Sequence, residues 1–170
     1  MIEMRIVGVR IEMPSQQPIL ILSEREGNRS LPILIGSTEA TAIAVHLQGM
    51  RPARPLTHDL LGQVIAALGH TVQEVRVVDF REGTFYGELV FENGTTVSAR
   101  PSDAVALAVR IDIPVFVDAA VLDSAGVVVT EEEELAEGDE ADVEEGDDEV
   151  ERFREFLDTV SPEDFGGEQR

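Results

Sequence analysis

The sequence predicts an α+β domain with a mixed or antiparallel sheet and helices packed on it, and three observations support this. Short segments rich in Val, Ile and Leu recur through residues 2–118 with turn residues between them, as strands do. Three other segments, near residues 37–49, 57–68 and 101–110, repeat apolar residues every three or four positions, which indicates amphipathic helices. At 170 residues and 43% hydrophobic composition, the chain is long enough for about one domain with an ordinary core.

The N-terminal third predicts three strands. Residues 2–13 carry apolar side chains on both faces, which predicts a strand that is covered on both sides. Residues 18–23 and 31–35 flank the turn sequence E-R-E-G-N-R, so they are expected to form a hairpin.

Two helices are expected to follow these strands. Ser37 or Thr38 can cap the first helix, and Gly49 can end it. After the crossing M-R-P-A-R-P, a second helix is predicted to open at Thr57 and to stop before Gly69.

The C-terminal half of the domain predicts a second group of strands and two more helices. An Asn-Gly pair at residues 93–94 predicts a hairpin turn. The expected elements are strands at 72–80, 82–91 and 96–100, a helix opening at 101–102, a strand at 114–118 and a short helix at 119–126.

The last forty residues differ from the rest of the chain. Residues 130–148 are almost entirely Glu, Asp, Gly and Ala, which predicts an acidic disordered linker after a domain spanning 1–129. Within 149–170 a helical stripe returns, formed by Val150, Phe153, Phe156, Leu157 and Val160. So short a helix is rarely stable alone, so we expect it to dock on its own domain, a neighbouring subunit or a partner.

The net charge of −21 is unevenly distributed. Residues 131–170 hold 19 acidic residues and three arginines, whereas residues 1–130 carry a net charge of only −5, and all their cations are Arg. Nucleic acid is therefore expected to bind weakly if it is a partner. There are no cysteines, no run of about 20 apolar residues and no signal-peptide pattern at the N-terminus, so a cytoplasmic location without a membrane partner is the simplest interpretation.

The stretch R-P-L-T-H-D-L-L (54–61) places His58 beside Asp59 where the second helix should begin. One interpretation is structural: Thr57 caps the helix, and Asp59 lies in the first turn, where exposed amides favour a carboxylate. The other is catalytic, because a His gains nothing from the dipole at a helix start. Adjacent helix residues point about 100° apart, so the pair does not form a metal site by itself.

The starts of the three main helices share a pattern. Each brings one carboxylate: Glu39, Asp59 and Asp103. If these starts converge, the three carboxylates could hold Mg²⁺ or Mn²⁺ through oxygen ligands, with His58 as base or ligand. Arg54 and Arg100, each followed by a proline, could then clamp a phosphate. If they do not converge, these are ordinary acids at helix N-termini.

Several blocks together resemble the bifunctional nuclease domain family. They are L-P-I-L-I-G-S-T-E-A-T-A-I-A, R-P-L-T-H-D-L-L, E-G-T-F-Y-G-E-L, S-A-R-P-S-D-A-V-A-L-A and P-V-F-V-D-A-A-V-L. The acidic stretch followed by F-R-E-F-L-D-T-V-S-P-E-D-F is similar to actinobacterial members. The resemblance implies an α+β domain, a homo-oligomer and a nuclease activity on RNA and DNA reported for plant relatives. It supplies no assigned catalytic set.

The sequence is therefore compatible with two functions. The first is phosphodiester hydrolysis of RNA or DNA assisted by a divalent metal, with His58, Asp59, Arg54 and Arg100 as the catalytic candidates. The alternative is a non-catalytic regulatory module that binds an anion or a protein, with the acidic tail mimicking nucleic acid. Phosphate-binding glycine loops and the serine-hydrolase and zinc-protease motifs do not occur in the sequence.

Overall fold

The computed structural model describes residues 1–128, which contain eight strands and four helices. The predicted linker at 130–148 and the predicted helix and tail at 149–170 lie outside the described residues. The strands are β1 (Ile2–Glu12), β2 (Gln17–Glu24), β3 (Arg29–Leu34), β4 (Val72–Arg81), β5 (Thr84–Phe91), β6 (Thr96–Ala99), β7 (Val115–Val117) and β8 (Val127–Val128). The helices are α1 (Ser37–Leu47), α2 (Thr57–Ala67), α3 (Pro101–Ile111) and α4 (Ala119–Ala125).

The strands form one mixed sheet in the order β6-β5-β4-β7-β1-β2-β3-β8, which confirms the predicted α+β class. Neighbouring strands are antiparallel except β4 and β7, which run parallel with Val77 beside Val117. The short strand β7 thereby joins the β4–β5–β6 half of the sheet to the β1–β2–β3 half. The two-residue edge strand β8 was not predicted.

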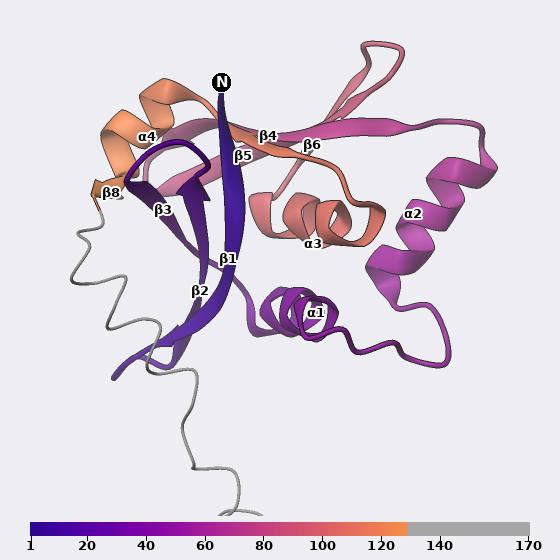
Figure 1. The fold of residues 1–170 in the computed structure, drawn as a ribbon, viewed down its shortest axis with the longest axis horizontal. Coiled ribbons are helices and arrows are strands. Elements are labelled where there is room, and N and C mark those ends of the chain that lie inside the picture. Colours follow the sequence, from indigo (N-terminus) through magenta and orange to yellow (C-terminus); the bar gives the residue numbers. More distant parts are fainter. Residues whose placement is uncertain (129–170) are drawn as a thin grey trace, which may run out of the picture. The chain divides into compact units, whose positions relative to one another are not determined.

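Helix α3 is the most deeply buried helix of residues 1–128, and it lies between the two halves of the sheet (Figure 1). Its sequence alternates small and branched apolar residues, and Ala104, Val105, Ala106, Leu107 and Ala108 are almost completely buried. It packs on β4 and β5 and contacts both α1 and α2. The starts of the three helices are therefore held close to one another.

The predicted helix caps are displaced by one or two residues. Gly36, not Ser37 or Thr38, is the N-cap of α1, and it provides no side-chain hydrogen bond. Leu56, not Thr57, is the N-cap of α2, and its amide donates to Oδ2 of Asp59 at 2.9 Å. The carboxylate of Asp59 thus satisfies one of the free amides at this helix start.

The prediction that β1 is covered on both faces is wrong over its second half. Met4 is buried, but Val7 and Ile11 are exposed. The pairing of β1 with β2 shifts register between Ile6 and Gly8, as at a β-bulge. A bulge changes which side chains face the core, so simple alternation cannot be followed through it.

Candidate active site

His58 and Asp103 meet although 45 positions separate them in the sequence. His58 lies in the first turn of α2 and Asp103 in the first turn of α3, and Nε2 of the imidazole is 3.3 Å from Oδ1 of the carboxylate. The two side chains are 13% and 32% exposed. The packing of α2 on α3 creates the pair, and within residues 1–128 the other ring nitrogen of His58 has no hydrogen-bond partner.

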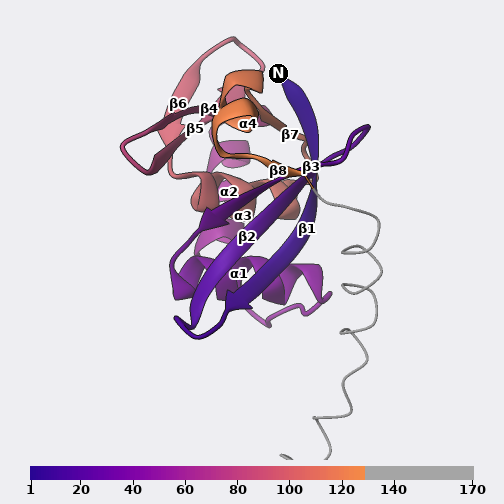
Figure 2. The same ribbon diagram turned by 90° about the vertical axis from the view of Figure 1, so that its left-hand side faces the viewer.

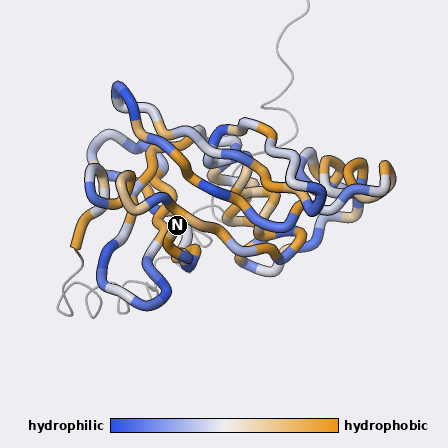
Figure 3. Tube along the Cα trace, turned by 90° about the horizontal axis from the view of Figure 1, so that it is seen from above, coloured by the Kyte–Doolittle hydropathy of each residue, from blue (hydrophilic) through white to orange (hydrophobic). Residues whose placement is uncertain are grey.

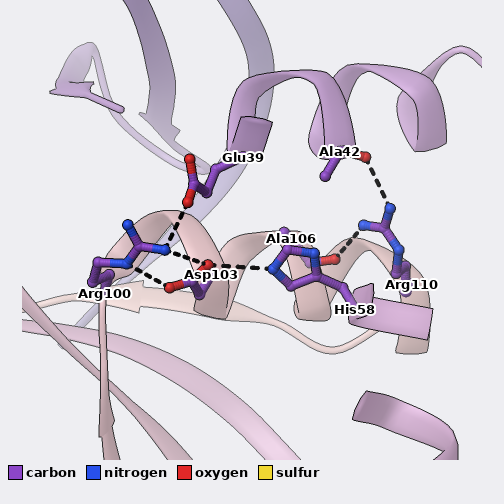
Figure 4. Close-up of polar contacts among 7 residues, drawn as sticks. All are labelled: Glu39, Ala42, His58, Arg100, Asp103, Ala106 and Arg110. Atoms are coloured by element: carbon purple, nitrogen blue, oxygen red, sulfur yellow. Dashed lines mark hydrogen bonds and ion pairs between the residues drawn. The ribbon is translucent and has the colours of Figure 1, made fainter. Parts of the chain in front are cut away.

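Arg100, the N-cap of α3, extends this contact to α1 (Figure 4). Its Nε donates to Oδ2 of Asp103 at 2.7 Å, and its Nη2 donates to Oδ1 at 3.1 Å. The same Nη2 donates to Oε1 of Glu39 at 2.6 Å. Four of the candidate residues therefore form one chain of contacts, in the order His58, Asp103, Arg100 and Glu39.

The ionisation of this cluster follows from its hydrogen bonds. The two carboxylates raise the pKa of Arg100, with Asp103 as the larger cause. The pKa of Glu39 is lowered, first by a hydrogen bond from its own backbone amide and then by Arg100. Glu39 folds over Gly36, where a β-carbon would collide with its Oε2, so the glycine leaves room for this carboxylate.

Asp59 turns away from this cluster toward Arg110. Its Oδ1 is 2.9 Å from Nε of Arg110, but the N–H does not point at the oxygen, so the contact is an ion pair rather than a hydrogen bond. Arg110 also donates to the carbonyls of Ala106 at 2.6 Å and Ala42 at 3.0 Å. Sequence reasoning missed Arg110; its only signal was a cation within the apolar run A-V-A-L-A-V-R-I.

Arg54 lines a hollow of about 350 Å³ together with Asp59 and Arg110, and Arg100 does not line it. His46 lines it too, and burial lowers the pKa of this imidazole, followed by the nearby arginines. Thus the structure groups Glu39, His58, Arg100 and Asp103, whereas Arg54 and Asp59 belong to a neighbouring group.

The metal prediction requires three carboxylates, and Asp59 does not join the other two. Within residues 1–128 there is no group of three or more His, Cys, Asp or Glu side chains that could hold a metal ion. Glu39 and Asp103 do approach each other, because both bind Arg100. These two carboxylates and one guanidinium leave one negative charge uncompensated when His58 is neutral.

Comparison with known proteins places this site in a family. The model of the bifunctional nuclease domain matches residues 20–130. An uncharacterized protein of Mycobacterium tuberculosis is 53% identical over 163 residues, which cover 96% of this chain and 97% of that protein. "Bifunctional nuclease 2" of rice is 25% identical over 76% of this chain and 42% of its own length. "Bifunctional nuclease 1" of Arabidopsis thaliana is 26% identical over 67% of this chain and 37% of its own length.

The matched region contains every candidate residue, from Glu39 to Asp103. It also contains α1, α2 and α3, the three helices whose starts form the cluster. In residues 1–128, no helix is long and apolar enough to cross a membrane. On the basis of the matched domain, this chain belongs to the bifunctional nuclease domain family.

Proposed function

We propose that this protein hydrolyses phosphodiester bonds in RNA or DNA, with His58 and Asp103 at the reaction centre. The observation that carries the proposal is the contact between these two residues, within a chain of polar groups built by three helix starts (Figure 4). Membership of a family whose plant relatives are named bifunctional nucleases supports the same reaction.

His58 is suited to be a general base. A carboxylate can only accept a hydrogen bond, so Nε2 of neutral His58 carries the proton toward Asp103 and Nδ1 keeps a lone pair. This arrangement, in which a carboxylate fixes the tautomer of an imidazole, is the one used to activate nucleophiles. We expect Nδ1 to take a proton from the attacking water as its oxygen bonds to phosphorus and the ester P–O bond breaks.

Arg100 is suited to neutralise the phosphate. Its Nε and Nη2 are occupied by carboxylates, but within residues 1–128 its Nη1 has no acceptor. The side chain of Arg100 is 66% exposed, so a phosphate can reach the free nitrogen. Asp103 and Glu39 then act as positioning residues that hold this fork in place.

A divalent ion remains part of the proposal, with Glu39 and Asp103 as the residues that would hold it. Mg²⁺ is commonly bound through one or two carboxylates and keeps several waters, so the carboxylate lone pairs that Arg100 leaves free would suit it. When bound, such an ion would supply Lewis-acid stabilisation of charge at phosphorus. The surplus negative charge of the cluster favours a cation here. Asp59, which is paired with Arg110, is the least suited of the three predicted ligands.

The test is hydrolysis of end-labelled RNA and DNA oligonucleotides by the full chain, with Mg²⁺, with Mn²⁺ and with EDTA. His58→Ala and Asp103→Asn are expected to lower the rate by about 10²–10⁴-fold, the usual contribution of general acid–base catalysis. His70→Ala is the matched control, because His70 is an exposed residue whose ring contacts Phe91. Equal rates in the wild type and all three variants would reject the site, and an unchanged rate in EDTA would reject the ion.

A further inference from the structure

A hollow of about 830 Å³ adjoins the candidate active site, with which it shares Arg100. It is bounded by the end of β3, the β4–β5 turn, the start of α3 and the end of α4, elements that Figure 2 shows. Its walls are mainly apolar and include two phenylalanine rings, Phe80 and Phe85. Among the described residues that line it, Arg100 is the only charged one.

The first helix turn of α3 opens into this hollow. Arg100, Pro101 and Ser102 all line it, and the side chain of the N-cap residue Arg100 makes no capping hydrogen bond with the amides of α3. Gly36, the N-cap of α1, lines the same hollow and also gives no side-chain cap. The dipole at the start of α3 favours an anion there, whereas the carboxylate of Glu39 already occupies the start of α1.

Ser102 provides an independent indication of a ligand. The residue as a whole is only 6% exposed, and it lines the hollow. Yet within residues 1–128 its hydroxyl has no hydrogen-bond partner. Among residues 1–128, Ser102 Oγ is not one of the fully buried polar atoms that lack a partner, so it is open to the hollow and can donate to a group bound there.

We propose that this hollow binds the nucleotide next to the bond that is cleaved. The phosphate lies at the start of α3, where the hydroxyl of Ser102 and the free Nη1 of Arg100 donate to it. The base lies against the partly exposed rings of Phe80 and Phe85, whose centroids are 4.4 Å apart. This inference rests on the proposed nuclease function and specifies how its substrate is held.

Arg100 connects this hollow with the reaction centre. Its Nε and Nη2 face the carboxylates of Asp103 and Glu39, whereas Nη1 is on the remaining side of the same rigid guanidinium (Figure 4). A nucleotide bound to Nη1 is therefore separated from Asp103, the partner of His58, only by the guanidinium group of Arg100. Apolar and aromatic walls stack any base, so the subsite is expected to accept nucleotides without strong base preference.

The test is titration of the full chain with adenosine 5′-monophosphate, followed by calorimetry, with inorganic phosphate and adenosine in separate titrations. The monophosphate is expected to bind more tightly than either fragment, because only it contacts both the helix start and the rings. Ser102→Ala is expected to weaken this binding about tenfold, the effect of losing one hydrogen bond to a charged group. Phe85→Leu should weaken the binding of the monophosphate and of adenosine, but not the binding of inorganic phosphate.

Ser124→Ala is the matched control, because Ser124 lines the same hollow but already donates to the carbonyl of Val121 at 3.1 Å. Its affinity should equal that of the wild type. Absence of monophosphate binding, or equal affinity in Ser102→Ala with unchanged circular dichroism, would overturn the subsite. Guanosine and cytidine monophosphates should bind within a few-fold of the adenosine form, and strong selection of one base would overturn the stacking role.

The subsite and the nuclease function can fail separately. His58→Ala should bind the monophosphate like the wild type, because His58 does not line the hollow. Binding without hydrolysis of any oligonucleotide would keep the subsite and reject the nuclease function. Hydrolysis that depends on His58 without monophosphate binding would reject the subsite alone.

Discussion

Asp59 Oδ1 lies 2.9 Å from Nε of Arg110, a side chain that is only 4% exposed. The other nitrogens of Arg110 donate to carbonyls of α1 and α3, while Asp59 belongs to the first turn of α2. One guanidinium thus joins three helices, and Asp59 supplies the charge that balances it. This contact gives Asp59 a structural role that does not depend on whether it takes part in catalysis.

Asp59→Asn is therefore expected to destabilise the fold strongly. The substitution leaves the buried Arg110 cation without an opposite charge; because Asp59 is itself 29% exposed, we expect a loss at the lower end of the about 3–5 kcal/mol that breaking a buried ion pair costs. Urea denaturation of the full chain measures this loss. Asp123→Asn is the matched control, because its carboxylate pairs with Arg29 but is 71% exposed, and exposed pairs contribute about 1 kcal/mol or less. Similar losses in both variants would contradict the assignment.

The contact between Glu39 and Arg100 predicts a dependence of stability on pH. Because the hydrogen bond from its own amide and then Arg100 lower the pKa of Glu39, the folded state binds a proton at this carboxylate less readily than the unfolded state. The stabilisation is therefore fully present above the unfolded pKa near 4.5, and it is lost as pH falls through the lower folded value.

Glu39→Gln should accordingly be less stable than the wild type at pH 7, and the difference should shrink as pH falls below about 4.5. Thermal unfolding at several pH values from 7 to 3 measures it. Glu26→Gln changes an exposed carboxylate in the turn between β2 and β3 and serves as the control. A difference from the wild type that stays constant over this range would show that Glu39 does not stabilise the fold through its charge.

The sequence could predict the elements of residues 1–128 because their signals are local. Periodic apolar residues mark α2 and α3, and glycine or Asn-Gly pairs mark the turns, so the bounds agree with the structure to within a few residues. The observed caps differ from the predicted ones because the position of an N-cap depends on where the preceding strand or loop ends. Gly36 follows β3 and Ile35 directly, so the N-cap of α1 lies one residue before Ser37. The edge strand β8 has only two residues, too few for any periodic signal.

The candidate site could be predicted only in part, because its contacts are not local. The carboxylate at each helix start was visible in the sequence, and three of those starts do converge. Which carboxylate would face Arg100 and which would face Arg110 depends on how α1, α2 and α3 rotate about their axes as they pack. The unpaired hydroxyl of Ser102 is equally a result of packing, since a serine at a helix start looks like an ordinary cap.

The exposed face of α2 predicts self-association. No residue of α2 is fully buried, and the helix is mostly hydrophobic in Figure 3. Its exposed apolar residues are Leu60, Leu61, Val64 and, at the C-cap, Leu68. The only acidic residue of α2, Asp59, is already paired with Arg110, so two acidic copies can approach through this face with little repulsion. We propose that a second copy covers it.

Light scattering coupled to size-exclusion chromatography should therefore give a mass at least twice that of one chain. Combining Leu61→Glu with Val64→Glu should reduce it to the monomer, because two charges would be buried at the interface. Ile11→Glu is the control, since Ile11 is 58% exposed on β1. A monomeric wild type, or an unchanged mass in the double variant, would reject this interface.

The acidic C-terminal residues are expected to weaken nucleic-acid binding through charge alone. Residues 131–170 carry a net charge of −16, against −5 for residues 1–130. Deleting them should tighten binding of a labelled oligonucleotide in fluorescence anisotropy. The gain should be larger at low salt, because the screening length grows from about 8 Å at physiological ionic strength to about 30 Å at 0.01 M.

A second variant separates charge from sequence. Replacing residues 131–148 by an equally long Gly-Ser segment removes 12 acidic residues and keeps the length of the chain. If repulsion is the cause, this variant should recover most of the affinity gained by the deletion, with the same dependence on salt. If it binds as weakly as the wild type while the deletion binds tightly, the remaining residues 149–170 must block the nucleic acid by another means, and the charge explanation is wrong.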